Sequence, residues 1–305
     1  MAGSPASGAR AGEAPRWLAF VSDYGLEDHL VGVCKGVIAK TAPTVRVIDV
    51  CHYISAQNVD VGARVLAETL PYLPQGIVLA LVDPFRREPA RAVAIRCGNG
   101  QVIVAPDNGL ASLAWAEAGG VEAAREATNA DLWTTSTPAS SFRGRDVFAP
   151  VAAHLAAGTP FEDVGVKVDP ATLVELRPAT PYVHGDHVHC SVRMTDHFGN
   201  LALNLQRSDL EACGIGFGDE VELRYNGKSM RVPFTSGFSD VSPGRTFVYE
   251  DSFRALTIVT VMGRAAETLR ASYGDPIVLA RVAVEPIAAG GKMRVVDAPP
   301  STATA

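Results

Sequence analysis

Carboxylate, imidazole and amide side chains stand at the ends of successive apolar runs in the first half of the chain. Asp23 follows WLAFVS, His52 follows VRVIDVC, Asp83 follows GIVLALV, and the pair Asp107-Asn108 follows QVIVAP. Each run has the length of a buried strand, and polar residues at the carboxyl ends of strands in an α/β sheet face a common crevice. Four such positions at successive strand ends predict a binding pocket.

The run that ends at Asp83 is followed by a concentration of charge. Arg86, Arg87, Glu88 and Arg91 all lie within PFRREPAR, before the next apolar run begins. A solvated loop between two strands explains such a pattern in most proteins. The alternative is that Asp83 faces a ligand, and the rest of the chain has to decide between the two.

The segment TDHFGN, residues 195–200, is the strongest local signal in the second half. An Asp and an Asn flank an aromatic residue and a glycine at the point where one strand breaks and another starts. Asp, Gly and Asn also form ordinary hairpin turns. Both a turn and a binding loop therefore remain open on these residues alone.

The composition excludes several classes of protein. With 305 residues, 47% of them hydrophobic, the chain can bury a sizeable core. The net charge of −6 argues against an obligate nucleic-acid partner. No apolar run approaches the roughly 18–20 residues that cross a bilayer. Five scattered cysteines without CxxC spacing are typical of reduced thiols in a cytoplasmic protein.

The segment HGDHVH contains three histidines, His184, His187 and His189, and invites interpretation as a metal site. Only His187 and His189 are expected to share a face of a strand, and no carboxylate or cysteine completes the set. No metal site is predicted. The phosphate-binding GxxxxGK[ST] and GxGxxG spacings and the GxSxG nucleophile motif are also missing from the sequence.

The patterning predicts two domains. Apolar strands alternate with helical periods over residues 16–178, which indicates an α/β domain with a mainly parallel sheet. Within it, AVAIRCGNGQVIVAPDNG is expected to form a hairpin. Short alternating strands over residues 182–292 predict a small all-β C-terminal domain. Residues 1–15 and 293–305 are small, polar and rich in proline, glycine or alanine, and are expected to be disordered tails.

Several short stretches together resemble one family, the S-adenosyl-L-methionine (SAM) hydroxide adenosyltransferases and the related SAM-dependent chlorinase and fluorinase. The stretches run in order through roughly residues 17–285: SDxG (22–25), CKG (34–36), DVCH (49–52), GAR (62–64), APDNGL (105–110), AHLAAG (153–158), DHFGN (196–200) and SF (252–253). Each stretch is weak alone, but the ordered set is specific. The resemblance implies displacement of methionine from the 5′ carbon of SAM, as substrate and without a cofactor or metal.

The resemblance also implies roles for individual residues. Asp23 corresponds to the carboxylate that binds both ribose hydroxyls, and Asp196 to the ligand of the methionine ammonium. The remaining substrate-binding residues that it implies are Ser252 near the methionine carboxylate, Asn200 and Phe238 at adenine, Gln57 beside the sugar, and Phe142 and Phe198. Family members form trimers with the site between one subunit's α/β domain and its neighbour's β domain, so a homotrimer is implied.

Three further positions bear on the nucleophile. Asp83 corresponds to an aspartate of the hydroxide enzymes, where the halogenases have tyrosine. Gly144 corresponds to a glycine of the chlorinase and the hydroxide enzymes, where the fluorinase has serine, and the extra fluorinase loop is missing near Cys97–Gln101. The hydroxide enzymes complete their aspartate with an arginine and a histidine, but Ala90 and Arg143 occupy those positions here.

Electrostatics favours water as the nucleophile. A halide about 4 Å from an ionised Asp83 would be repelled by roughly 4 kcal/mol at an effective dielectric constant of 20. Arg143 can offset that charge but cannot act as a base, so any base function falls to Asp83. We expect a SAM hydrolase that forms adenosine and methionine. A chlorinase-like halogenase and a non-catalytic SAM or adenosine binder are the alternatives.

Overall fold

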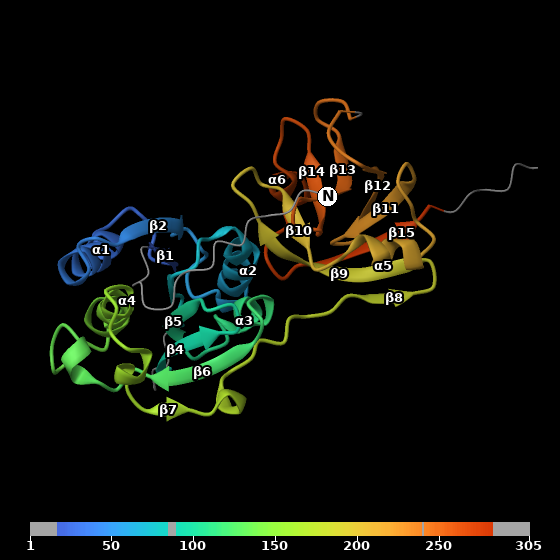
Figure 1. The fold of residues 1–305 in the computed structure, drawn as a ribbon. Coiled ribbons are helices and arrows are strands. Elements are labelled where there is room, and N and C mark those ends of the chain that lie inside the picture. The colour runs from blue at the N-terminus through green and yellow to red at the C-terminus, as the bar shows by residue number, and fades with distance from the viewer. Residues whose placement is uncertain (1–16, 85–89, 240, 283–305) are drawn as a thin grey trace, which may run out of the picture. The chain divides into compact units, whose positions relative to one another are not determined.

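The structure is a computed structural model that describes residues 17–84, 90–239 and 241–282. The chain divides into two compact units, residues 1–179 (the N-terminal unit) and 180–305 (the C-terminal unit). Figure 1 shows the elements of each unit. The two expected disordered tails and the pair Arg86-Arg87 lie outside the described residues.

The N-terminal unit is built on a seven-stranded sheet of order β2-β1-β3-β5-β4-β6-β7. The strands are β1 (Trp17–Ser22), β2 (Arg46–Cys51), β3 (Ile77–Leu81), β4 (Ala92–Cys97), β5 (Val102–Pro106), β6 (Val121–Glu126) and β7 (Lys167–Val168). Strands β2, β1, β3 and β5 pair in parallel, whereas β4 pairs antiparallel with both β5 and β6, and β6 with β7.

The expectation of a mainly parallel sheet was therefore wrong, and the sheet is mixed. The physical reason lies in the predicted hairpin, which the structure confirms as β4 and β5. The turn between them is tight: Cys97 N–H donates to the Gln101 carbonyl at 2.8 Å, and Gly100 adopts a φ of 85°. Two strands joined by so short a turn can only pair antiparallel, because a parallel pair needs a crossover.

Helices cover both faces of this sheet (Figure 1). They are α1 (Leu30–Thr41), α2 (Val59–Thr69), α3 (Ser112–Glu117) and α4 (Ala149–Ala156), with 3-10 turns at Leu70–Tyr72, Ala130–Leu132, Phe161–Val164 and Pro170–Thr172 and a π-helical turn at Gly144–Phe148. One core cluster joins α1 and α4 to alternate residues of the strands, such as Leu18 and Phe20. Alternation in the strands explains why one face buries these residues while Ala19 and Val21 are buried on the other.

The C-terminal unit is a closed barrel. Its strands are β8 (Tyr182–His184), β9 (His187–Thr195), β10 (Leu201–Leu203), β11 (Glu220–Tyr225), β12 (Lys228–Thr235), β13 (Thr246–Glu250), β14 (Leu256–Thr260) and β15 (Pro276–Arg281). The order β10-β14-β13-β12-β11-β15-β9 is closed by pairing of β9 with β10, and β8 pairs along the outside of β9. Two short helices, α5 (Arg207–Ala212) and α6 (Ala265–Leu269), accompany the β-rich fold.

The histidine-rich segment forms the β8–β9 hairpin. His184 lies directly opposite His187 and Tyr182 opposite His189, so all three histidines share a face, and the expectation that His184 points elsewhere was wrong. The His184 and His187 ring centroids are 5.2 Å apart, as are those of His187 and His189. In the described part of the chain, no group of three or more His, Cys, Asp or Glu side chains has an arrangement that could hold a metal ion. Nor does any helix there have the length and apolar character that a membrane span requires.

Asp146 anchors the π-helical turn that begins at Gly144. Its side chain is only 2% exposed and accepts hydrogen bonds from Thr134 Oγ1 at 2.9 Å, Ala139 N at 2.8 Å and Arg145 Nε at 2.6 Å. The hydrogen bond from Arg145 is the main reason that the pKa of Asp146 falls to about 2. The carboxylate thus fastens the preceding loop to the start of α4.

We expect Asp146→Asn to lower the free energy of unfolding at pH 7 by about 2 kcal/mol or more. The asparagine side chain has no charge, and its NH2 group would face hydrogen-bond donors that now donate to the carboxylate. Because the native pKa of Asp146 lies below its ordinary value, the stabilisation is complete above about pH 4 and is lost as the pH falls toward 2. Urea denaturation of both proteins between pH 7 and pH 3 should therefore show the difference shrinking. The exposed Asp131→Asn is the control, and an equal loss there would contradict this role.

Candidate active site

The parallel pairing of β2, β1, β3 and β5 brings four carboxyl ends to one edge of the N-terminal sheet. Main-chain hydrogen bonds join the segments that leave these strands. Asp23 N–H donates to the Leu81 carbonyl at 3.2 Å, and Gly25 N–H donates to the His52 carbonyl at 2.7 Å. The strand-end residues predicted to share a pocket are thus neighbours, although they do not all have the same function.

The Asp23 carboxylate is held by the main chain of Gln57. Gln57 N–H donates to Asp23 Oδ2 at 2.8 Å, and Gln57 adopts a φ of 65° just before α2. Burial raises the pKa of Asp23 above its ordinary value, and this hydrogen bond partly opposes the effect. A left-handed conformation is costly for a residue other than glycine and is often found at functional sites. Here the left-handed conformation of Gln57 directs its main-chain N–H to the carboxylate of Asp23.

His52 belongs to a chain of hydrogen bonds beneath this edge that runs from the buried Ser22 to the partly exposed Asp49 and Lys35. Its Nδ1 lies 2.7 Å from Ser22 Oγ, its Nε2 lies 3.2 Å from Asp49 Oδ1, and Lys35 Nζ contacts Asp49 Oδ2 at 2.8 Å. Burial alone would raise the pKa of Asp49, but the hydrogen bonds from Lys35 and His52 outweigh it and lower that pKa. The CKG and DVCH stretches therefore support the loop that carries Asp23.

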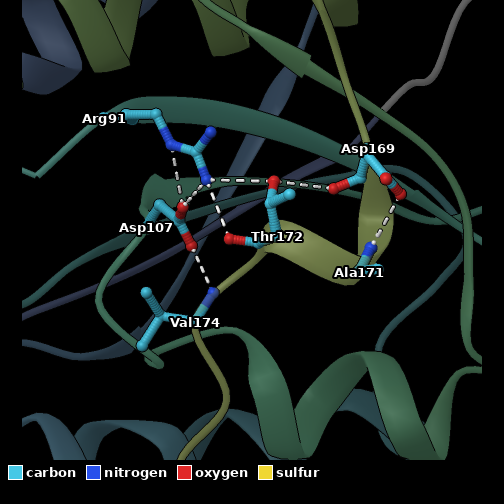
Figure 2. Close-up of polar contacts among 6 residues, drawn as sticks. All are labelled: Arg91, Asp107, Asp169, Ala171, Thr172 and Val174. Atoms are coloured by element: carbon cyan, nitrogen blue, oxygen red, sulfur yellow. Dashed lines mark hydrogen bonds and ion pairs between the residues drawn. The ribbon is translucent and has the colours of Figure 1, made fainter.

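Asp107 has a similar supporting function, which Figure 2 shows. Arg91 Nε donates to Asp107 Oδ2 at 3.0 Å, and Val174 N–H donates to Asp107 Oδ1 at 2.8 Å. The same guanidinium donates to the Thr172 carbonyl at 3.0 Å. Arg91 and Asp107 thus fasten the 172–174 segment to the end of β5. The guanidinium of Arg91 is thus engaged in holding this segment in place.

Asp83 receives a hydrogen bond from Asn108, which the sequence analysis placed at a strand end of the predicted pocket but to which it gave no individual role. Asn108 Nδ2 donates to Asp83 Oδ1 at 3.2 Å and to the Val82 carbonyl at 2.9 Å. Asn108 Oδ1 accepts from Leu110 N–H at 3.1 Å, and the residue is 5% exposed. The APDNGL stretch was the available signal, because a buried asparagine beside a turn usually bonds to neighbouring groups.

Arg143 lies within electrostatic range of Asp83. Its Nη1 donates to the Ala90 carbonyl at 2.7 Å, and its guanidinium carbon lies 5.1 Å from the centre of the Phe148 ring. Burial lowers the pKa of Arg143, while the negative charge of Asp83 acts in the opposite direction. The charges of Asp83 and Arg143 therefore act on each other, and Gly144 begins the turn directly after Arg143.

Phe142 and Gly144 line the same region of the N-terminal unit. The Phe142 ring meets Tyr24 edge to face, with ring centroids 6.0 Å apart. A Cβ atom on Gly144 would lie 2.3 Å from Tyr24 Oη and 3.2 Å from Leu81 Cδ1. A serine at position 144 would therefore collide with Tyr24, which explains in physical terms why this chain has glycine there.

In the C-terminal unit, the TDHFGN loop is closed by its own polar residues. Asn200 N–H donates to Asp196 Oδ1 at 2.8 Å, and Asn200 Nδ2 donates to Asp196 Oδ2 at 2.7 Å. Gly199 adopts a φ of 80°, and Phe198 at the tip is 70% exposed. The loop is thus a hydrogen-bonded turn, and the two oxygens of the carboxylate have further lone pairs that can accept from another donor.

Phe238 and Ser252 lie on two other loops of the same unit. Phe238 is 50% exposed and packs edge to face on Tyr249 and Phe247, at centroid distances of 5.1 and 5.2 Å. The exposed Ser252 sits in a turn held by Asp251, whose Oδ1 accepts from Phe253 N–H at 2.8 Å. Burial raises the pKa of Tyr249, with Asp251 and Asp196 adding to the effect, so the TDHFGN loop lies within electrostatic range of this aromatic cluster.

Each unit thus holds its own group of predicted site residues. Comparison with known proteins gives the class to which the chain belongs. Residues 18–165 match the model of the SAM hydroxide adenosyltransferase N-terminal domain, and residues 190–278 match that of its C-terminal domain. The chain belongs to the SAM hydroxide adenosyltransferase family.

Individual relatives agree with that assignment. The chain is 42% identical to an (R)-S-adenosyl-L-methionine hydrolase of Salinispora tropica, over 85% of this chain and 95% of the relative. It is 38% identical to a protein of the same name from Thermus thermophilus, over 85% and 97%, and 32% identical to a fluorinase of Actinopolyspora mzabensis, over 77% and 87%. Among solved structures, an uncharacterized conserved protein from Thermotoga maritima matches with a TM-score of 0.79 and 34% identity, over 87% of this chain and all of that one.

We expect Asn108→Asp to lower the free energy of unfolding at pH 7 by about 3 kcal/mol, because a buried carboxylate would face the Val82 carbonyl and Asp83 without a donor. Urea denaturation at pH 7 and pH 5 should show partial recovery at the lower pH, since the introduced carboxyl group regains one donor when it is protonated. Asn129→Asp is the matched control, because the Asn129 amide donates to the Asp163 carbonyl in an exposed position. Equal losses in the two variants would contradict the buried positioning role of Asn108.

Proposed function

We propose that this protein cleaves SAM with water at the 5′ carbon and releases adenosine and L-methionine. The observation that carries the proposal is the aspartate at position 83, held by Asn108 at the sheet edge, in a chain of this family. The relatives at 38–42% identity that are named hydrolases support the same reaction. Their name specifies the (R) epimer of SAM, which we also propose as the preferred substrate here.

The chemistry needs positioning more than acid catalysis. The oxygen of water forms a bond to C5′ while the C5′–S bond breaks. The electron pair of the C5′–S bond stays with sulfur, which becomes the neutral thioether of methionine. A sulfonium is already a good leaving group, so the leaving group needs no proton. The barrier then lies in holding water in line behind the carbon, opposite sulfur, and in receiving its proton.

Asp83 is suited to receive that proton. A carboxylate is in general a weak base at neutral pH, so the main role of Asp83 is to orient the water. Arg143 stands near Asp83 and limits the negative charge that the site presents. This feature favours one alternative reaction: the arginine would also allow a halide to enter, giving a 5′-halo-5′-deoxyadenosine.

The remaining residues bind substrate in this proposal. Asp23 takes the two ribose hydroxyls beside Gln57, and Phe142 borders the same region. On the C-terminal unit, Asp196 binds the ammonium of the methionine part, with the other contacts from Phe198, Asn200, Phe238 and Ser252. We further propose a homotrimer in the cytoplasm that needs no cofactor, as the family resemblance implies, and light scattering of the purified protein tests the trimer.

Incubation of the protein with each epimer of SAM tests the reaction directly. We expect adenosine and L-methionine in equal amounts from the (R) epimer, identified by mass spectrometry, and no dependence on chloride. A chloride-dependent 5′-chloro-5′-deoxyadenosine would instead establish the halogenase alternative. Binding of SAM without methionine release over hours would indicate a binding protein.

Two substitutions separate the roles of Asp83 and Arg143. Asp83→Asn should keep SAM binding but lower hydrolysis by about 10²-fold or more, the scale expected for a lost positioned base. Arg143→His restores the residue type of the hydroxide enzymes and should hold or raise the rate. The exposed Asp163→Asn is the control for Asp83→Asn. A faster reaction in Asp83→Asn with chloride present would overturn the choice of water.

A further inference from the structure

Tyr24 is a polar side chain of this region to which the family resemblance assigned no role. It follows Asp23 directly after β1 and is half-buried. Its ring packs on the core of the N-terminal unit and against the edge of Phe142. Packing of the ring fixes the position of the hydroxyl oxygen, because that oxygen lies in the plane of the ring and moves only with it.

The hydroxyl points to the region of the nucleophile. Tyr24 Oη fills the space in front of Gly144, only 2.3 Å from where a Cβ would stand, and Leu81 Cδ1 borders the same space. The charges of both Asp23 and Asp83 act on this hydroxyl. Tyr24 Oη therefore lies among three positions that the family directs to ribose and nucleophile: 23, 83 and 144.

The oxygen is a hydrogen-bonding group with capacity to spare. Within residues 17–84, 90–239 and 241–282, the hydroxyl makes no hydrogen bond to the protein, although the Tyr24 main-chain N–H contacts Ser22 Oγ at 3.4 Å. A polar group in such a place without a partner is costly unless water or a ligand satisfies it.

The hydroxyl also stays protonated. Burial raises the pKa of Tyr24 above its ordinary value, and the negative charges nearby, including those of Asp23 and Asp83, add to this effect. The same charges favour an O–H dipole that points toward the carboxylates. A lone pair on Tyr24 Oη is then left to accept a hydrogen bond from another molecule.

We propose that Tyr24 Oη binds the nucleophilic water together with Asp83, an inference that rests on the proposed hydrolysis of SAM. One O–H of the water donates to Asp83 and the other to Tyr24, which leaves a lone pair directed at C5′. As the C–O bond forms and the electrons of the C–S bond pass to sulfur, Asp83 takes the first proton. Tyr24 keeps its own proton and its hydrogen bond to the 5′-hydroxyl of the product. Tyr24 is then a catalytic residue that, with Gly144, also limits the size of the nucleophile site.

Tyr24→Phe tests this assignment because it removes the oxygen and keeps the ring. We expect kcat for adenosine formation to fall about 10-fold, as one lost hydrogen bond of ordinary strength allows, while KM for SAM changes less than about 2-fold. Tyr72→Phe is the matched control, since Tyr72 is 76% exposed and precedes β3 at the opposite edge of the sheet. An unchanged kcat in Tyr24→Phe, with the melting temperature also unchanged, would overturn the proposal.

Gly144→Ala in both backgrounds supplies a second, geometric test. In the unchanged protein the added methyl group meets Tyr24 Oη, so we expect a further large loss of kcat. In Tyr24→Phe the nearest ring atom is Cζ, 3.2 Å away, and the loss should be several-fold smaller. Additive losses would contradict the contact. The unmutated protein is assayed first: if it releases no methionine from SAM, the proposed function fails, whereas activity that is insensitive to Tyr24→Phe refutes this inference alone.

Discussion

The parallel pairing of β1 with β2 on one side and β3 on the other is the constraint from which the N-terminal site follows. Because of this pairing, the segments that follow β1, β2 and β3 leave the sheet at the same edge, close enough to hydrogen-bond to one another. The strands are almost wholly apolar where β1 and β3 meet, so their register is fixed by burial rather than by polar contacts. The polar residues that follow are then free to specialise, because the core does not depend on them.

Those polar residues specialise in two ways. His52 and Asp107 turn toward the protein and satisfy buried or main-chain groups, whereas Asp23 and Asp83 accept hydrogen bonds from Gln57 and Asn108 and remain within electrostatic range of one another. A carboxylate that is saturated by protein donors supports structure. One that keeps a lone pair can accept from a ligand, at a cost in burial that raises the pKa of Asp23.

The residue types predict where the strand-end polar residues lie, but they do not predict which of these residues support the structure and which can bind a ligand. Strand-end polarity correctly indicated that positions 23, 52, 83 and 107–108 meet, because parallel strands end at one edge. It could not tell Asp107 from Asp83, since the partner of Asp107 depends on the distant 172–174 segment. The antiparallel strands of the mixed sheet, and the position of His184 on the same face as His187 and His189, depend on turn geometry. The periodicity of apolar residues carries no information about turn geometry. The sequence did not single out Tyr24 as a candidate site residue, because aromatic residues beside strands usually pack in the hydrophobic core.

The hydrogen bond from Arg143 to position 90 has a consequence for how such a site can change during evolution. The acceptor is the main-chain carbonyl of Ala90, which every amino acid possesses, so the contact survives any substitution at 90 that keeps the backbone in place. A change at 143, in contrast, removes both the donor for that carbonyl and the cation near Asp83. With an arginine at 143, the side chain at 90 can therefore change without loss of this contact, whereas a change at 143 removes it. The contact thus constrains the side chain at 143 but only the main chain at 90.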